Sequence, residues 1–154
     1  MYTIDLKDKV AVVTGGNRGI GKSIVEILLK AGAKVVVYDM QVDSVEELKK
    51  EYGEENIAGY AGSVTDSKAV EKMTTEVVEH FGSYDLLINN AGISTMDYVV
   101  DIKEEDWDKV MDVNAKGVFL VSQQAARQML KQENRGKIIN ISSQAGKNGY
   151  RGMG

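Results

Sequence analysis

The 154-residue chain contains no cysteine and no proline, and it has a single histidine and a single tryptophan. Without cysteine it can form no disulfide and bind no metal through thiolates, which fits a reducing compartment. Without proline, the boundaries of helices and strands must be marked by glycine, asparagine and aspartate. No segment reaches the ~20 apolar residues of a membrane span, and the first residues lack the apolar run of a signal peptide. A cytoplasmic protein without membrane contact is expected.

The chain also lacks an excess of positive charge, since its formal net charge is −4. Without a basic stripe, nucleic acid is not expected as a partner. The composition, 43% hydrophobic and 27% charged residues, is ordinary for a globular protein. Because the length is close to the commonest domain size and no linker or repeat is visible, one domain over residues 1–154 is expected.

Short β-branched runs alternate with longer helical patterns along the whole chain. This alternation predicts parallel strands joined by right-handed crossovers, that is, an α/β doubly wound sheet. The helix after the first strand is expected to bury one face, formed by Ile20, Ile24, Ile27, Leu28 and Ala31. Strands are predicted at 10–14, 34–38, 57–61, 85–89 and 137–142, and further helices at 44–52, 67–81 and 104–132.

The stretch TGGNRGIG, residues 14–21, lies between the first strand and this helix. A loop in this position directs backbone N–H groups and the positive end of the helix at one point, where an anionic pyrophosphate fits. Gly15 would allow a tight turn, Gly19 a close approach of backbone to phosphate, and Gly21 close packing of helix on strand. Taken alone, the loop is as consistent with an ordinary glycine-rich turn as with a nucleotide site.

Asp39 favours the nucleotide interpretation, because it follows Gly21 by roughly the ~20 residues expected of a carboxylate at the end of the second strand. There it can accept both adenosine ribose hydroxyls and repel a 2′-phosphate, which favours NAD over NADP. Arg18 would instead favour NADP if its cation contacts the 2′-phosphate, although it can also be a solvated loop residue. We expect NAD, with NADP as the alternative. Other expected contacts are Asn17, Ile20 and Met40.

Four motifs follow one another along the chain: TGxxxGIG at 14–21, NNAG at 89–92, VNAKGVF at 113–119 and KIINISS at 137–143. In this order and spacing they resemble the short-chain dehydrogenase/reductase family over nearly the whole sequence. The resemblance implies a Rossmann-type sheet of order 3-2-1-4-5, an NAD(P)(H) cofactor, and hydride transfer to or from a carbonyl or alcohol carbon. The stretches GGNRGIG and INISSQAG resemble the corresponding sequences of polyol and sugar dehydrogenases, which implies a polyol, sugar or hydroxyketone substrate.

The resemblance also implies further cofactor contacts. Asn90, Ala91 and Gly92 would lie beside the adenosine ribose and brace the central strand. The family's adenine-binding Asp-Val pair is replaced here by Ser63 and Val64, where the serine can still form a hydrogen bond.

Two residues carry catalytic roles by the same resemblance. Asn114 matches the asparagine that kinks the long helix and holds a water in a proton relay, although an asparagine inside a helix can also bend it without any chemistry. Ser143 matches the serine that binds and polarises the reacting oxygen. Asn89 is expected to satisfy neighbouring backbone groups rather than to touch a ligand.

The family's general acid is a tyrosine in a YxxxK motif, which would fall at about position 156, whereas the sequence ends at Gly154. Tyr150 lies too close to Ser143, and Gly154 occupies the place of its lysine, so Tyr150 is not expected to be the acid. The chain is expected to be the N-terminal portion of a longer domain that lacks its last strands and helices. It would then be an incomplete enzyme or, alternatively, a non-catalytic nucleotide-binding or self-associating fragment.

A homo-oligomer is expected through one of two surfaces. The fifth strand, 138–141, would be an apolar edge that invites pairing with another chain. The long helix over 107–129 forms a dimer interface in the family that the sequence resembles.

Overall fold

The β-branched runs form one parallel sheet in the computed structural model, which describes residues 4–152. The strands are β1 (Val10–Thr14), β2 (Lys34–Asp39), β3 (Ile57–Ala61), β4 (Leu86–Asn89) and β5 (Lys137–Asn140), and their order in the sheet is β3-β2-β1-β4-β5. This is the predicted Rossmann-type order, so the expected fold class is confirmed.

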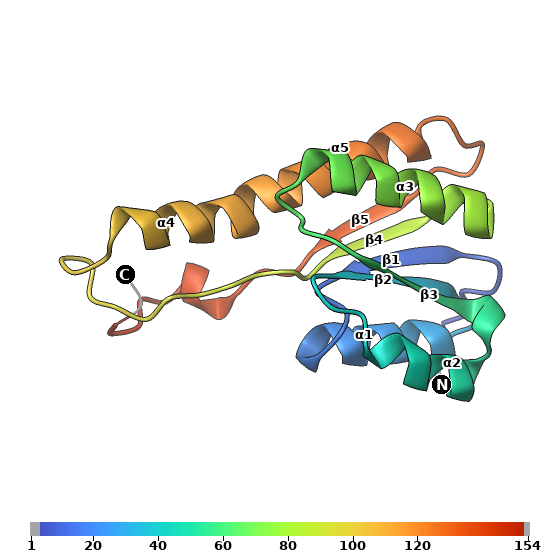
Figure 1. Cartoon of the computed structure of the whole chain (residues 1–154), viewed down its shortest axis with the longest axis horizontal. Coiled ribbons are helices and arrows are strands. Elements are labelled where there is room, and N and C mark those ends of the chain that lie inside the picture. The colour runs from blue at the N-terminus through green and yellow to red at the C-terminus, as the bar shows by residue number, and fades with distance from the viewer. Residues whose placement is uncertain (1–3, 153–154) are drawn as a thin grey trace.

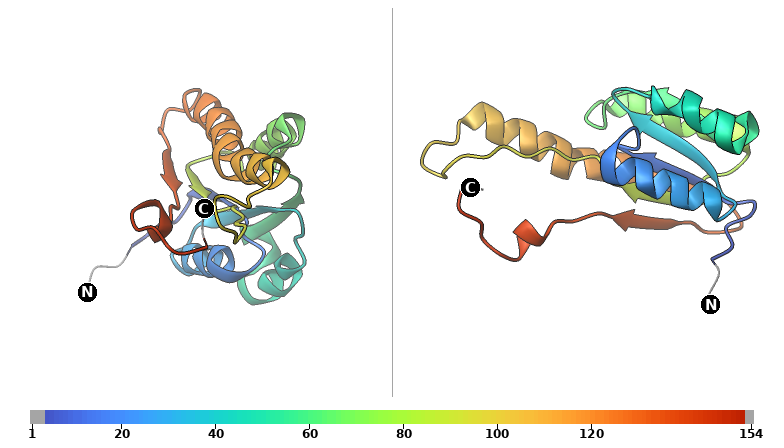
Figure 2. Two further views of the ribbon diagram at one scale, coloured as in Figure 1. Left: turned by 90° about the vertical axis from the view of Figure 1, so that its left-hand side faces the viewer. Right: turned by 90° about the horizontal axis from the view of Figure 1, so that it is seen from below.

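Helices cover both faces of the sheet (Figure 1). One face carries α1 (Gly19–Lys30) and α2 (Ser44–Tyr52), and the other carries α3 (Ser67–Phe81) and α5 (Val118–Met129). Helix α4 (Glu104–Met111) continues the line of α5 and extends beyond the sheet (Figure 2). Short turns complete the described chain: η1 (Glu54–Asn56), the wide π-turn η2 (Asp112–Gly117) and η3 (Gln144–Gly146).

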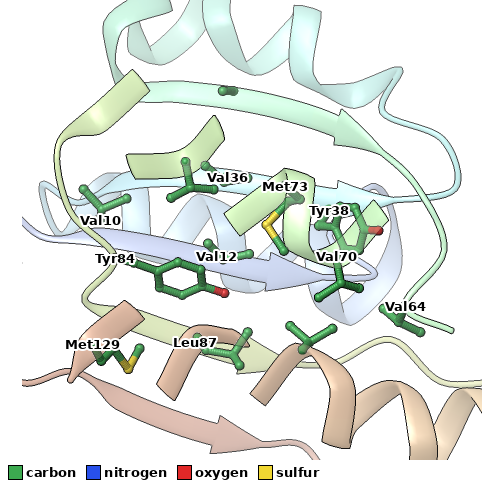
Figure 3. Close-up of a cluster of buried hydrophobic side chains, with 14 residues drawn as sticks. Val10, Val12, Val36, Tyr38, Val64, Val70, Met73, Tyr84, Leu87 and Met129 are labelled. Carbon is green, nitrogen blue, oxygen red and sulfur yellow. The ribbon is translucent and has the colours of Figure 1, made fainter. Parts of the chain in front are cut away.

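Strand β1 is central and buried along its whole length, so its side chains must be apolar on both faces. Val10 and Val12 belong to the core under α3 and α5, whereas Ala11 and Val13 belong to the core over α1 and α2. Figure 3 shows the first of these two cores, in which Tyr84 lies among the valines of the sheet. The continuous apolar run of β1 thus divides its side chains between two separate cores.

Tyr84 is fully buried, and its hydroxyl has no hydrogen-bond partner among the described residues. Burial raises the pKa of this phenol. Its backbone is held by Gln132: the Tyr84 N–H donates to Gln132 Oε1 (2.9 Å), and Gln132 Nε2 donates to the Tyr84 carbonyl (3.1 Å). This reciprocal pair fastens the segment after α5 to the start of β4.

Helix α1 buries only part of the predicted face: Ile24 and Leu28 are half-buried and pack against the core, whereas the other two isoleucines point to solvent. Ile20 and Ile27 are 70% and 65% exposed. Gly21 sets the rotation of the helix, because a Cβ at this position would overlap the carbonyl oxygen of Gly15. The prediction was wrong for the two isoleucines because it assigned the buried face from apolar side chains alone and did not combine it with the close packing expected at Gly21. The buried residues are Gly21, Val25 and Leu29.

Smaller differences concern element ends. Strand β4 starts one residue later than predicted, because Asp85 is a buried carboxylate that accepts from the Val10 N–H (2.9 Å) and the Ser83 hydroxyl (2.7 Å). The long helix predicted over 104–132 is interrupted by η2 and ends at Met129. Over residues 4–152, no helix has the length and apolarity needed to cross a bilayer. The prediction for Gly154 lies outside the described residues.

Replacing Gly21 by alanine tests the contact that orients α1. We expect the free energy of unfolding to fall by about 1–3 kcal/mol, because the new methyl group meets a backbone carbonyl that cannot move aside. Urea unfolding measures the change. Gly146→Ala is the matched control, since its Cβ would meet nothing within 4 Å. Equal stability of the two variants would contradict the proposed close packing.

Candidate functional site

A cavity of about 980 Å³ opens at the carboxyl ends of β1, β2, β3 and β4. The loops after parallel strands meet at one edge of the sheet, which is where ligands bind in such folds. All thirteen residues predicted to contact the cofactor line this one cavity, although they come from four separate segments of the chain. They are Gly15, Asn17, Arg18, Gly19, Ile20, Gly21, Asp39, Met40, Ser63, Val64, Asn90, Ala91 and Gly92.

The cavity also has lining residues that the sequence prediction missed. One wall comes from α4 and η2, which lie far from the glycine loop in the sequence. Glu105, Asp108, Lys109 and Asp112 recur there at helical spacing, but that spacing is equally typical of a solvated face, so only the fold reveals the wall. The other missed lining residues are Tyr38, Gln41, Gly62, Thr65, Ile93 and Val113.

Gly15 and Gly19 serve different purposes in the loop. Gly15 has a φ of +65°, and a Cβ there would lie 2.9 Å from the Cα of Ala91, so both conformation and packing require glycine. Gly19 has a φ of +56° at the first residue of α1, but its Cβ position has nothing within 4 Å. The space beside Gly19 is therefore open at the N-terminus of α1, where the helix dipole favours an anion.

Thr14 and Asn90 fasten the glycine loop to the loop after β4. The Thr14 hydroxyl accepts from the backbone N–H groups of Asn90 and Ala91, both at 3.0 Å. In return, Asn90 Nδ2 donates to the carbonyls of Thr14 (3.1 Å) and Gly15 (3.0 Å). Both donor hydrogens of this amide are used within the protein, so Asn90 shapes the cavity wall chiefly as a brace.

Asn89, the preceding residue, points to the opposite side of β4. Its Nδ2 donates to Ser122 Oγ and to Asn140 Oδ1, each at 2.8 Å. The expectation that it would satisfy backbone groups is wrong, because its described partners are side chains of α5 and β5. This side chain therefore ties β4 to both neighbouring elements.

Asp39 ends β2 with its carboxylate at the cavity. Its Oδ2 accepts from the backbone N–H of Asn17 (3.1 Å), while Asn17 Oδ1 accepts from the Ser44 N–H (3.0 Å) at the start of α2. The glycine loop, β2 and α2 are thereby locked together. Arg18, at the N-terminus of α1, has an exposed side chain, and Met40 is 69% exposed beside Asp39.

The loop after β3 is held from below by Tyr38, whose hydroxyl donates to the Ser63 carbonyl (3.0 Å). Burial, and then the nearby Asp66 carboxylate, raises the pKa of Tyr38 to about 12, so this donor stays protonated at neutral pH. From the side, Val64 packs where a Cβ on Gly117 would come within 2.6 Å of it. Ser63 is therefore held at a fixed place on the cavity wall.

Asn114 lies in the wide turn η2 and outside the described lining of the cavity. Its Oδ1 accepts from the Ile93 N–H (2.9 Å), and its Nδ2 donates to the Ile93 carbonyl (2.8 Å). These two bonds join the helical turn to the loop after β4. The amide retains a second N–H that Ile93 does not use.

Ser143 also lies outside the described lining, in the exposed segment after β5. Its Oγ accepts from the Ala145 N–H (3.1 Å) and so begins the turn η3. Because the oxygen acts here as an acceptor, the hydroxyl proton stays available for donation. Farther along, Arg151 lies over the ring of Tyr98 at 5.9 Å, which sets this segment against the loop that leads into α4.

Comparisons with known proteins agree with this geometry. Residues 9–154 match the short chain dehydrogenase family. The chain is 40% identical over 145 residues to 3-oxoacyl-[acyl-carrier-protein] reductase FabG of Thermotoga maritima, covering 92% of this chain and 58% of the relative. For the same reductase of Staphylococcus aureus the values are 42% over 148 residues, 94% and 60%. A 3alpha-hydroxysteroid dehydrogenase of Mediterraneibacter gnavus is 39% identical over 142 residues, covering 90% and 56%. The chain thus spans less than two thirds of the length of these relatives.

A Thr14→Val variant tests the brace between the two loops. It keeps the shape of the side chain but removes the acceptor of two backbone N–H groups, so we expect a loss of about 1–3 kcal/mol in the free energy of unfolding. Urea unfolding gives the value. Thr75→Val is the control, because Thr75 is exposed on α3 and bonds only within its own helix. A loss no larger than that of the control would show that the brace contributes nothing.

Proposed function

The chain belongs to the short-chain dehydrogenase family, and we propose that it binds NAD(H) in the cavity for hydride transfer between the nicotinamide and a carbonyl or alcohol carbon. One observation carries the proposal: the thirteen predicted cofactor contacts, which come from four separate stretches of the sequence, line a single cavity at the carboxyl edge of the sheet. When bound, the dinucleotide supplies or accepts the hydride, and the protein supplies position and electrostatics.

The glycine loop is the proposed seat of the pyrophosphate. Loop N–H groups and the N-terminus of α1 favour negative charge there, and the open space beside Gly19 lets an anion approach the backbone. Because the brace from Asn90 fixes the loop carbonyls, the loop needs little reorganisation to bind an anion. Binding then costs little ordering of the loop.

Asp39 is proposed to hold the adenosine ribose, and NAD is proposed rather than NADP. The carboxylate is anchored by one bond from the Asn17 N–H and retains lone pairs for ribose hydroxyls. A 2′-phosphate at this place would meet the carboxylate as a like charge. Arg18 has an exposed side chain that lines the same cavity, which supports the alternative that NADP is also accepted.

Ser143 and Asn114 are the proposed catalytic pair. The free proton of Ser143 suits a hydroxyl that donates to the reacting oxygen and polarises the carbonyl. Asn114 has one amide N–H left over from its clamp on Ile93, which suits the binding of a relay water.

The proposed substrates are a ketone and the corresponding secondary alcohol. The relatives are named as a reductase of 3-oxoacyl groups on acyl carrier protein and as a dehydrogenase of a steroid 3-hydroxyl, so their names share this chemistry. A narrower proposal is that the substrate is a polyol, sugar or hydroxyketone, which the sequences of the motifs suggest. Residues 1–154 are proposed to be one NAD(P)-binding domain, the N-terminal portion of a longer one.

Asp39→Asn tests the cofactor site. The substitution keeps an acceptor for Asn17 but removes the charge, so we expect NADH affinity to fall by about 10- to 100-fold, with a smaller loss for NADPH. Fluorescence titration with both nucleotides measures the two affinities. Asp43→Asn is the matched control, since Asp43 lies four residues farther along and is not among the described lining residues. Unchanged NADH affinity would remove Asp39 from the site.

Self-association is a second proposed property, because apolar side chains remain exposed on two described surfaces. Ile139 in β5 is 50% exposed, and Trp107 and Phe119 on the long helical segment are 56% and 57% exposed. Among residues 4–152, β5 pairs only with β4. Either surface can bury apolar area against a second copy of the chain.

Sedimentation velocity at tens of micromolar tests this proposal. We expect a species heavier than the 16.9 kDa chain. Ile139→Lys should dissociate it if the strand edge pairs, and Phe119→Lys should do so if the helix packs, because a buried lysine is costly. A monomer in the unsubstituted chain would refute both routes.

A further inference from the structure

The base-binding end of the cavity follows from the order of the strands. Starting at the glycine loop after β1, the cavity reaches Asp39 at the end of β2 and then Ser63, Val64 and Thr65 after β3, the next strand outward. A dinucleotide with its pyrophosphate at the loop and its ribose at Asp39 therefore places its purine against residues 63–65. This step rests on the proposed function.

Two hydroxyls face each other at this end. Ser63 Oγ and Thr65 Oγ1 lie 2.8 Å apart, and either one can be the donor. The Thr65 backbone N–H also donates to Ser63 Oγ (3.2 Å) and takes one of its two lone pairs. The proton arrangement of the pair therefore decides what Ser63 can offer to a ligand.

The pair has two arrangements. If Ser63 donates to Thr65, one lone pair of Ser63 remains, and the serine can accept from an amino group. If Thr65 donates to Ser63, both lone pairs are filled, and the Ser63 proton is free to donate to a carbonyl oxygen. Rotating two hydroxyl protons converts the position from an acceptor into a donor, and no heavy atom has to move.

We propose that the Ser63–Thr65 hydroxyl pair makes the base-binding end of the cavity tolerant of both 6-amino and 6-oxo purines. Nicotinamide hypoxanthine dinucleotide, which carries an oxygen in place of the 6-amino group and a proton on the adjacent ring nitrogen N1, then binds nearly as well as NAD. A carboxylate at position 63 could only accept hydrogen bonds, and it would reject the 6-oxo group.

Neighbouring residues hold the hydroxyl pair in place. Tyr38 and Val64, at the same end of the core in Figure 3, hold the loop from beneath and from the side. Asp66, the carboxylate of this loop, accepts from the N–H groups of Lys68 and Ala69 and caps α3. Both bonds go to Asp66 Oδ1, so this oxygen is directed at the helix.

The α4 wall of the same cavity carries hydrogen-bonding groups of both kinds. It offers carboxylates on α4, including Asp108, and the ammonium group of Lys109 beside them. Acceptors and a donor are both present there, so this wall can meet an amino or an oxo group.

The test is to titrate the purified chain with NAD and with nicotinamide hypoxanthine dinucleotide by isothermal calorimetry. We expect the two dissociation constants to agree within about threefold, because each base finds a neutral hydrogen bond at Ser63. A preference for NAD of about tenfold or more would overturn the inference while leaving the proposed function intact. If neither nucleotide binds, the proposed function fails, and the inference fails with it.

A Ser63→Asp variant gives the second measurement. We expect it to keep NAD binding within about threefold and to weaken the hypoxanthine nucleotide by about tenfold or more, because a carboxylate repels the 6-oxo group. Thr75→Asp is the control, because it adds the same charge on the exposed face of α3 and should leave the ratio of the two constants unchanged. Circular dichroism checks that the variants fold.

An unchanged ratio in a folded Ser63→Asp variant would show that Ser63 does not contact the base, which would overturn the inference. If that variant does not fold, Ser63→Ala replaces it. Alanine removes the donor and the acceptor together, so both nucleotides should weaken by a similar factor of about 3 to 10. Unchanged binding of both nucleotides to Ser63→Ala would equally overturn the inference.

Discussion

The site depends on the reciprocal bonding between Thr14 and Asn90, which joins the loops after β1 and β4. One hydroxyl accepts two backbone N–H groups, and one amide donates to two backbone carbonyls. These four bonds fix the glycine loop before any ligand is present. Helix α1 packs against this fixed loop at Gly21, where a side chain would overlap the Gly15 carbonyl. The position of the helix N-terminus, and with it the proposed phosphate site, follows from this arrangement.

Around this brace, each remaining loop is held by one or two polar contacts. Asn17 links the glycine loop to β2 and α2, Tyr38 supports the loop after β3, and Asn114 clamps the loop after β4 onto the π-turn η2. Most of these contacts use backbone groups on one side, so they fix the course of the chain as well as side-chain positions. A cavity built in this way is preorganised, which lowers the cost of ordering its walls on binding. On the sheet side of the cavity, the groups that these contacts leave for a ligand include the Asp39 carboxylate, the hydroxyls of Ser63 and Thr65, and N–H groups at the start of α1.

The proposed specificity follows from which polar groups remain free to contact a ligand. Asp39 is a charged acceptor and discriminates by charge, whereas Ser63 and Thr65 are neutral and can exchange their donor and acceptor roles. The proposed site would thus combine selection by charge at the ribose end with tolerance at the base end. The two properties come from different strands, β2 and β3, and can be changed independently by substitution.

The sequence by itself determined the α/β class, the positions of most elements and the identity of the glycine loop, because these depend on local patterns: apolar runs, glycines at fixed spacing and an acidic residue at a strand end. The strand order was implied by the family resemblance of four motifs, and the fold confirms it. Tertiary structure decided what depends on contacts between distant segments. The buried face of α1 was fixed by Gly21 against Gly15, which an apolar count over Ile20 and Ile27 had no means to detect. The α4 wall of the cavity and the pairing of Asn89 with side chains likewise exist only once the sheet brings remote residues together. The periodicity of apolar residues describes a single helix or strand, whereas close packing depends on two segments that only the fold brings together.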